Sequence, residues 1–115
     1  MTIKRGGIFI ATLNPVIGKE ISKTRPVVVI SNNINNKYSG TVTVLPLTSK
    51  KLDKIYPFEV LLSKGAGNLP KDSKLKADQI RTLDQSRLIS KIGIIKEEDM
   101  EEVEKAVKIH LGFLV

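Results

Sequence analysis

The sequence predicts a mainly β protein in which a small, strongly bent antiparallel sheet is followed by one C-terminal α-helix. Three observations predict it: several short apolar or alternating runs, turn-forming residues between them, and a last segment with helical spacing. The chain has 115 residues, enough for one compact core without room for a second. We therefore expect a single domain over residues 1–115.

Most of the strands are predicted by apolar runs and by alternation. They are expected over residues 8–13, 27–30, 41–47, 56–62, 73–83 and 88–95. Four consecutive β-branched residues occupy 27–30, and these suit a packed sheet and are poor helix formers, so this strand should be buried. Pro57 places the strand at 56–62 on a sheet edge. The segment 73–83 alternates throughout and is expected to be one strand that could carry a bulge.

Turn signals separate these strands. Residues 32–40 predict a helical turn or an irregular crossing, and Asp84 is expected to cap a short turn over 85–87. The last strand should break near Gly93. Residues 14–24 show no clear period, and loops of that length in a small domain are usually functional or disordered.

The last segment has helical spacing. Its apolar residues are Met100, Val103, Val107 and Leu111. Acidic residues fill the first turn after Lys96, and Gly112 lies where a C-terminal cap belongs, so an amphipathic helix of about four turns is predicted. Five or six short strands with one terminal helix are typical of an SH3-like barrel.

The net charge of +7 belongs to the body of the chain. Residues 1–95 contain 16 Lys and Arg against 6 Asp and Glu, a balance of +10, whereas residues 96–115 contain 3 against 6, a balance of −3. A folded body with that excess attracts polyanions through counterion release, and nucleic acid is the leading candidate. Charge that only keeps a small protein soluble is the alternative.

Composition excludes several kinds of chemistry. The chain has no Cys and one His, His110, so it lacks a thiol nucleophile and a pair of histidines. Its carboxylates do not cluster with metal-ligand spacing, and we expect neither a metal nor a cofactor. No apolar run approaches the ~20 residues of a membrane helix, and the N-terminus lacks the apolar core of a signal peptide. We expect a soluble, cytoplasmic protein that does not bind membranes.

The remaining polar residues favour a reaction without a metal. Glu20 and Arg25 lie on the approach to the buried strand. The next strand ends in two hydroxyls and two cations, where a phosphate could be held: Thr48, Ser49, Lys50 and Lys51. RNA cleavage by its own 2′-hydroxyl fits this set, because the substrate supplies the nucleophile and the protein supplies a base, a cation and a proton donor. DNA lacks that hydroxyl. The alternative is a solvated loop with a weak surface ion pair.

Short motifs in a fixed order cover nearly the whole chain. They are Lys4-Arg5-Gly6, Leu13-Asn14-Pro15, Gly18-x-Glu20, Arg25-Pro26-Val27-Val28-Val29-Ile30-Ser31-Asn32, Pro46-Leu47-Thr48-Ser49, Tyr56-Pro57-Phe58, Lys71-Asp72-Ser73, Asp78-Gln79-Ile80-Arg81-Thr82-Leu83-Asp84, Arg87-Leu88 and, at the end of the chain, Met100, Val103, Ala106 and His110-Leu111-Gly112. In this set the chain resembles the MazF/PemK (Kid) family of type II toxins. It departs from many members at Gly7, where they have an aspartate.

The resemblance implies a homodimeric, SH3-like barrel endoribonuclease that cuts single-stranded mRNA at short sequences, leaving a 2′,3′-cyclic phosphate and a 5′-hydroxyl. It also implies a cognate antitoxin whose disordered, acidic C-terminal segment covers the RNA groove. Arg25 and Thr48 carry over as the catalytic pair, with Glu20 as a proposed base. The residues expected to bind nucleic acid are Asn14, Lys19, Ser49, Lys50 and Gln79, with Gln79 on the rim of the groove.

The chemistry of each side chain limits its role. Arginine stays charged, so Arg25 suits stabilisation of the phosphorane better than proton donation. Thr48 can donate a hydrogen bond to a non-bridging oxygen, and the carboxylate of Glu20 can serve as a base if its loop brings it close. Two other functions stay open: an inhibitor that binds a protein, as the gyrase poison CcdB does, and a non-catalytic RNA-binding barrel.

Overall fold

The computed structural model describes residues 1–21 and 23–113. Its strands are β1 (Gly7–Thr12), β2 (Thr24–Val29), β3 (Thr41–Thr48), β4 (Glu59–Leu62), β5 (Ser73–Lys76), β6 (Arg81–Asp84) and β7 (Leu88–Ile94). Its helices are α1 (Asn33–Tyr38) and α2 (Glu97–Leu111), with 3₁₀ turns η1 (Ala66–Asn68), η2 (Ala77–Gln79) and η3 (Gln85–Arg87). The predicted fold class is confirmed.

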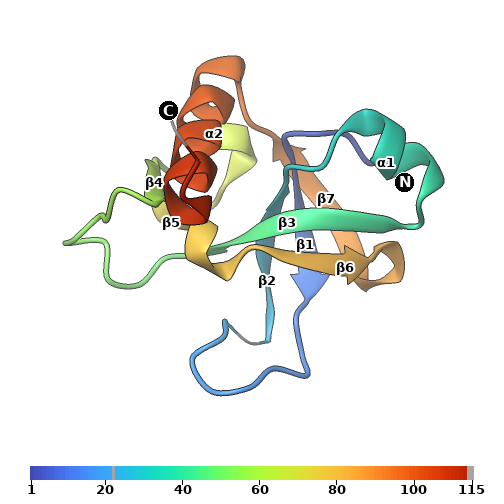
Figure 1. Cartoon of the computed structure of the whole chain (residues 1–115), viewed down its shortest axis with the longest axis horizontal. Helices are drawn as coiled ribbons and strands as arrows, with labels where there is room; N and C mark the ends of the chain where they lie inside the picture. The colour runs from blue at the N-terminus through green and yellow to red at the C-terminus, as the bar shows by residue number, and fades with distance from the viewer. Residues whose placement is uncertain (22, 114–115) are drawn as a thin grey trace.

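All strand pairs in the sheet are antiparallel, and β3 is the strand around which it bends. The hydrogen-bonded order is β4-β5-β3-β2-β1-β7. The first half of β3 pairs with β6, and its last two residues pair with β5 (Figure 1). The two ends of this long strand therefore belong to different parts of the bent sheet. Among the described strands, β4 and β7 end this order, and no pair between them closes the sheet into a complete barrel.

The prediction of one strand over 73–83 was wrong. The turn η2 interrupts it. The amide of Ala77 still donates to the carbonyl oxygen of Phe58, next in the pairing of β5 with β4, and the amide of Ile80 then donates back to Ala77 within the turn. The side chain of Ala77 is buried, so the chain turns a corner inside the core between β5 and β6. Alternation of side chains continues through such a corner, which is why the pattern could not show it.

Two other strand predictions need correction. The segment 56–62 enters the sheet only at Glu59, because Pro57 lies in the preceding turn, although β4 does lie at a sheet edge. Strand β7 continues through Gly93. A Cβ there would stand 2.3 Å from the carbonyl oxygen of Gly67, so this glycine lets η1 pack against the strand.

The run of valines in β2 is buried on both faces of the sheet. Val28 packs in one core cluster with Ile8 and Leu45, while Val27 and Val29 pack in another. A strand that has core on both sides has no need of polar alternation, and this explains its uninterrupted β-branched sequence. The buried half of β2 is a rigid base for the polar residues that begin the strand.

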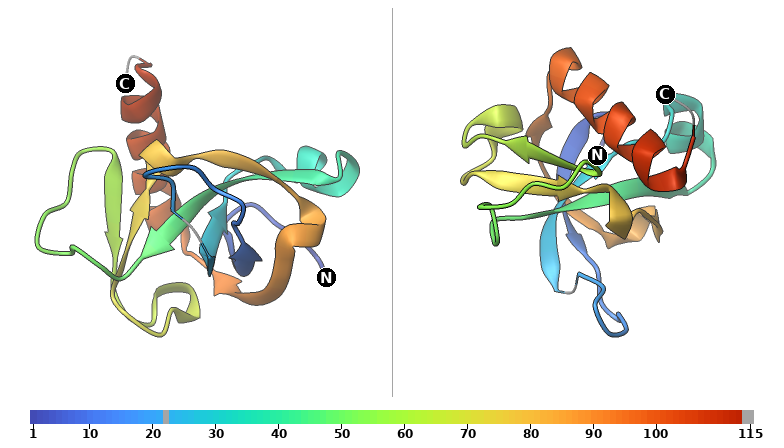
Figure 2. Two further views of the ribbon diagram at one scale, coloured as in Figure 1. Left: turned by 90° about the horizontal axis from the view of Figure 1, so that it is seen from below. Right: turned by 60° about the vertical axis from the view of Figure 1, so that its left-hand side comes forward.

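Helix α2 covers one side of the sheet (Figure 2). Met100, Val103 and Ala106 are its buried residues, whereas Leu111, predicted on the apolar face, is 47% exposed. Gly112 has a φ of 77° and its amide donates to the carbonyl oxygen of Ile109, which confirms the predicted C-terminal cap. No helix within the described ranges is long and apolar enough to cross a membrane.

The predicted turns between the strands are present. Residues 33–38 form α1, and the side chain of Asn32 accepts a hydrogen bond of 2.8 Å from the amide of Asn35 at its start. Asp84 caps η3 by accepting one of 2.9 Å from the amide of Ser86. The loop before β2 projects from one end of the sheet (Figures 1 and 2).

Candidate functional site

Arg25 and Thr48 lie in the same surface hollow. Arg25 is the second residue of β2 and Thr48 is the last residue of β3. Because these strands are antiparallel neighbours, the start of one lies beside the end of the other. The hollow has a volume of about 190 Å³ and is lined by Ile21, Arg25, Thr48, Lys50, Lys51, Lys74 and Lys76. We call it the basic hollow.

A second hollow adjoins the other side of Arg25. Its volume is about 210 Å³, and its lining residues are Arg25, Pro26, Leu47, Ser49, Leu69, Pro70, Lys71 and Ser73. Arg25 is the residue shared by the two hollows. An extended chain that crosses the start of β2 would therefore meet cations and a hydroxyl on one side of Arg25, and mostly small and apolar groups on the other.

The basic hollow concentrates positive charge. Among the described residues that line it, five are Arg or Lys and none is a carboxylate. Converging cations with no anion among them raise the local potential and attract phosphates. The arrangement suits a polyanion, and the planar guanidinium of Arg25 can hold two oxygens of one phosphate at once.

A buried carboxylate, Glu59, supports two of these lysines. Its Oε1 lies 3.1 Å from Nζ of Lys74, and its Oε2 lies 3.0 Å from Nζ of Lys76. Burial opposes the charged form, but the Tyr56 amide and the two ammonium groups outweigh it, and together they hold the pKa of Glu59 below its ordinary value. Glu59 is therefore a charged group beneath the hollow at neutral pH.

Thr48 also shapes the loop that follows it. Its Oγ1 accepts a hydrogen bond of 3.2 Å from the amide of Lys50, and a threonine hydroxyl that accepts one bond still has its proton to donate. Lys50, predicted to bind nucleic acid, lies in the basic hollow with Thr48, and Ser49 lies in the adjoining one.

Glu20 and Lys19 lie on the exposed loop before β2, outside the lining of both hollows. Oε1 of Glu20 accepts a hydrogen bond of 2.8 Å from the amide of Ile17, which closes a turn within the loop. The structure thus brings Arg25 and Thr48 together but does not bring Glu20 to them.

Asn14 and Gln79 hold the two ends of that loop. The side chain of Asn14 accepts a hydrogen bond of 3.1 Å from the amide of Lys23, across the base of the loop. The side chain of Gln79 accepts one of 3.1 Å from the amide of Ile21, which lines the basic hollow. Both residues therefore position the loop beside the hollow.

Sequence reasoning placed Lys51 at the phosphate-holding strand end but did not include Lys74 and Lys76 in the site. Lys74 stands directly opposite Thr48 in the pairing of β3 with β5, and that register cannot be read from composition. The alternation of Lys74 and Lys76 around buried Leu75 was the available signal. It shows that both lysines share a face, but not that this face is the one that carries Thr48.

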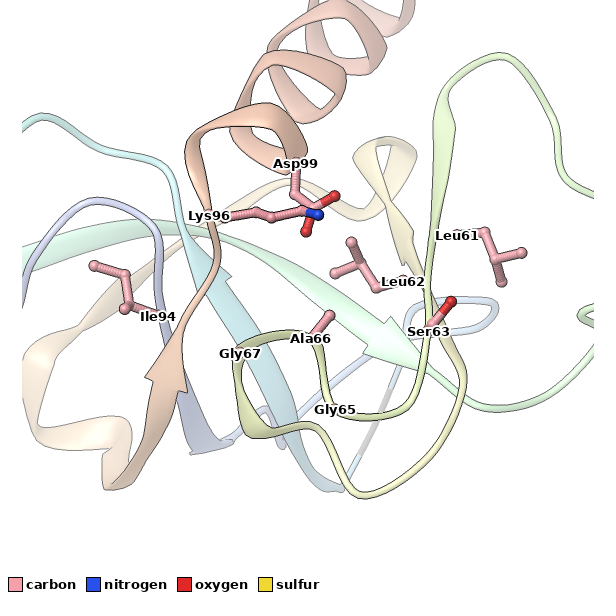
Figure 3. Close-up of a pocket in the computed structure, with 9 residues that line it drawn as sticks. All are labelled: Leu61, Leu62, Ser63, Gly65, Ala66, Gly67, Ile94, Lys96 and Asp99. Carbon is pink, nitrogen blue, oxygen red and sulfur yellow. The ribbon is translucent and has the colours of Figure 1, made fainter.

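A larger hollow lies elsewhere in the molecule, beside α2. Its volume is about 430 Å³, and η1, β4, the end of β7 and the start of α2 surround it (Figure 3). Its ionisable lining residues are Lys96 and Asp99, which project from the start of α2. None of the predicted site residues lines it. Within residues 1–21 and 23–113, no group of three or more His, Cys, Asp or Glu could hold a metal ion.

Comparison with known proteins gives concordant results. Residues 4–111 match the family of PemK-like, MazF-like toxins of type II toxin–antitoxin systems. The chain is 41% identical over 110 residues to the Endoribonuclease MazF of Staphylococcus saprophyticus subsp. saprophyticus, covering 96% of this chain and 92% of that protein.

Solved structures agree with the sequence match. MazF from Deinococcus radiodurans has a TM-score of 0.84 and 28% identity, covering 98% of this chain and 99% of that one. The MazE-MazF structure from the same organism (Form-II) has a TM-score of 0.77 and 25% identity, covering 99% of each chain. The present chain therefore belongs to the family of PemK-like, MazF-like toxins of type II toxin–antitoxin systems, and it is an endoribonuclease.

Proposed function

We propose that this endoribonuclease toxin cleaves single-stranded mRNA without a metal ion, through attack of a 2′-hydroxyl on the adjacent phosphorus. The observation that carries the proposal is the position of Arg25 and Thr48 in one hollow whose other charged lining residues are all lysines. That hollow offers a phosphate two kinds of hydrogen-bond donor and a surplus of positive charge. Its small volume and open position suit one part of an extended chain.

The reaction forms one bond and breaks one. The 2′-oxygen bonds to phosphorus while the bond from phosphorus to the 5′-oxygen breaks, which leaves a 2′,3′-cyclic phosphate and a 5′-hydroxyl. The guanidinium of Arg25 stabilises the negative charge that builds up on the non-bridging oxygens, and the hydroxyl of Thr48 donates a hydrogen bond to one of them. The 2′-hydroxyl gives up a proton to a base, and the 5′-oxygen gains one.

Glu20 can act as that base only in another conformation of its loop. In the present conformation its carboxylate accepts from the amide of Ile17 and lies outside the basic hollow. The loop is held at its base through Asn14 and near its end through Gln79, so movement between these points would leave both anchors in place. Lys19 travels with Glu20 and would meet the RNA backbone in the same conformation.

The partners follow from the family and from the charge. We propose that a cognate antitoxin inhibits the protein by laying a disordered, acidic C-terminal segment over the basic hollow, as its surplus of cations favours. We further propose that the whole chain is one domain, that two copies form a homodimer, and that the protein acts in the cytoplasm, where mRNA and the antitoxin are found.

The test of the proposal uses RNA from which one 2′-hydroxyl, the proposed nucleophile, has been removed. A long single-stranded RNA is digested in the presence of a chelator, and the cleavage site is mapped from its new 5′ ends. An oligonucleotide with a 2′-deoxy sugar at that site should then resist cleavage, while the same change one nucleotide away should not protect it. Cleavage of the deoxy-substituted bond, or a requirement for a divalent metal, would contradict the mechanism.

A further inference from the structure

Strand β5 presents a row of polar groups to the basic hollow. Lys74 pairs with Thr48 of β3 on one side, and Lys76 pairs with Glu59 of β4 on the other. Directly paired residues in antiparallel strands project to the same face, and so do residues two apart in one strand. The two lysines, Thr48 and Glu59 therefore share one face of the sheet, while Leu75 between the lysines is buried in the core.

The charged groups beneath the hollow are largely buried, and two lysines share the one carboxylate of Glu59. The side chain of Glu59 is 0% exposed, that of Lys74 is 5% exposed and that of Lys76 is 22% exposed. Lys74 is fully engaged below the surface, because its Nζ also donates a hydrogen bond of 3.2 Å to the carbonyl oxygen of Lys54. Lys76 is the more exposed of the two, and its Nζ is 3.9 Å from Asp78, a longer contact than its 3.0 Å contact with Glu59.

Such a cluster is a poor way to stabilise a fold. Taking two ammonium groups and a carboxylate out of water is costly, and well-packed apolar side chains of similar volume usually serve stability as well or better. The structural need at these positions could be met by methionine and leucine. A second lysine on the same buried carboxylate therefore indicates a role outside folding, and Lys76 lines the same hollow as Thr48, which points to a role in RNA binding.

We propose that Lys76 binds an RNA phosphate next to the one that is cleaved, with Glu59 and Lys74 as the group that holds it in place. This inference rests on the proposed function and names a subsite for that same reaction. Arg25 and Thr48 engage the reacting phosphate, and Lys76, which lines the same hollow, meets its neighbour. Lys76 then contributes to binding of the RNA backbone, and Glu59 is a positioning residue.

The first test compares Lys76→Met with Lys91→Met. The former leaves Glu59 and Lys74 as a one-to-one pair, and the latter removes an equal charge from an exposed position on β7. The probe is an all-2′-O-methyl RNA containing the cleavage site, which cannot react, titrated in chelator at several salt concentrations. Lys76→Met should raise Kd about three- to tenfold and reduce the salt slope by about 0.7, whereas Lys91→Met should change neither.

Kinetics separate binding from chemistry. With cleavable RNA, Lys76→Met should raise KM by a similar factor and leave kcat unchanged, because the neighbouring phosphate is bound equally in the ground state and in the transition state. A fall in kcat with KM unchanged would overturn the assignment. If the wild-type protein fails to cut RNA in chelator, the proposed function itself has failed, whatever the lysines do.

Glu59→Gln tests positioning through the sign of its effect. If only total charge mattered, removal of a carboxylate would strengthen RNA binding. If Glu59 holds Lys76 in place, Kd should instead rise about threefold, and Glu59→Asp should recover part of the loss. Stronger binding by Glu59→Gln would overturn the positioning role.

A variant with an apolar cluster keeps the test valid if Glu59→Gln does not fold. Glu59→Leu/Lys74→Met/Lys76→Met replaces all three charges, and it should fold with a Tm at least equal to that of the wild type while showing the same rise in Kd. Wild-type affinity in this folded variant would overturn the proposal. Binding of poly-glutamate, a mimic of an acidic protein segment, is measured in parallel. Weaker binding of poly-glutamate with unchanged binding of RNA would also overturn the proposal and would assign the cluster to an acidic protein partner.

Discussion

The basic hollow is smaller than the large hollow beside α2, but it carries more positive charge. The first has about 190 Å³ and five lining cations, and the second has about 430 Å³ with one lysine and one aspartate. Small-molecule sites usually enclose roughly 300–1,000 Å³, so size alone favours the second. A polyanionic chain lies along a surface and needs converging charge more than enclosure, so charge favours the first as the proposed RNA site.

The difference arises from how each hollow is built. Strand ends form the basic hollow, and a strand end fixes its side chains because the rest of the strand is packed in the core. The backbone of η1 and the first turn of α2 border the large one (Figure 3). Its lining includes one lysine and one aspartate, whose charges offset each other, so it lacks the converging cations of the basic hollow.

The largest expected effect is that of Arg25→Ala. Loss of the cation that stabilises the phosphorane should reduce the rate of RNA cleavage by about 10²–10³-fold. The buried valines of β2 are untouched, so the Tm should change little. Single-turnover cleavage of a mapped RNA and thermal unfolding measure the two effects. Arg25→Lys, which keeps the charge but loses the planar fork, should retain part of the activity.

Glu59→Gln tests how much the buried carboxylate beneath the basic hollow contributes to stability. Removal of the carboxylate leaves Lys74 buried without its counter-charge and should lower the free energy of unfolding by about 3 kcal/mol at neutral pH. Because the pKa of Glu59 is lower in the folded protein than its ordinary value of 4.5, its contribution is present above about pH 4.5 and is lost as the pH falls through the folded pKa. Urea unfolding at several pH values should show the two proteins converging in acid. A difference that does not depend on pH would contradict this account.

Thr48→Val removes a hydroxyl while keeping the shape of the side chain. One hydrogen bond to a charged oxygen is worth roughly 1.5–3 kcal/mol, so cleavage should slow by about 10- to 100-fold. Thr82→Val on β6, an exposed threonine away from both hollows, is the matched control and should cleave at the wild-type rate. Equal rates in the two variants would remove Thr48 from the mechanism.

The smallest effect is expected in the large hollow. Lys96→Met takes a cation from its lining, as Lys76→Met does in the basic hollow. Cleavage, RNA affinity and salt slope should all stay within about twofold of the wild-type values, and stability within about 0.5 kcal/mol. If Lys96→Met weakened RNA binding as much as Lys76→Met, the distinction between the two hollows would fail.

The sequence was sufficient for most of the fold because its local signals agree with the tertiary structure. The valines of β2 favour a buried strand, and the acidic residues of 97–99 favour the start of a helix; the structure has both. The corner at η2 was missed because it lies between two alternating runs, and the burial of Ala77 there is a tertiary feature that alternation does not show.

The candidate site was predictable in part for a similar reason. Arg25 and Thr48 stand next to rigid strand ends, so motif position and spatial position coincide. Glu20 depends on loop conformation, and Lys74 and Lys76 depend on the register between β3 and β5, two properties that a single sequence specifies weakly.

The loop between β1 and β2 is tied down at its base from elsewhere in the fold. Arg81 donates a hydrogen bond of 3.0 Å to the carbonyl oxygen of Leu13, and Arg87 donates to those of Thr12 and Asn14. With its stem held in this way, doubling the span above it would cost only about 0.6 kcal/mol of closure entropy. Insertions and deletions in this segment are thus expected to leave the sheet folded, so any change they make to the RNA sequences that are cut would be independent of stability.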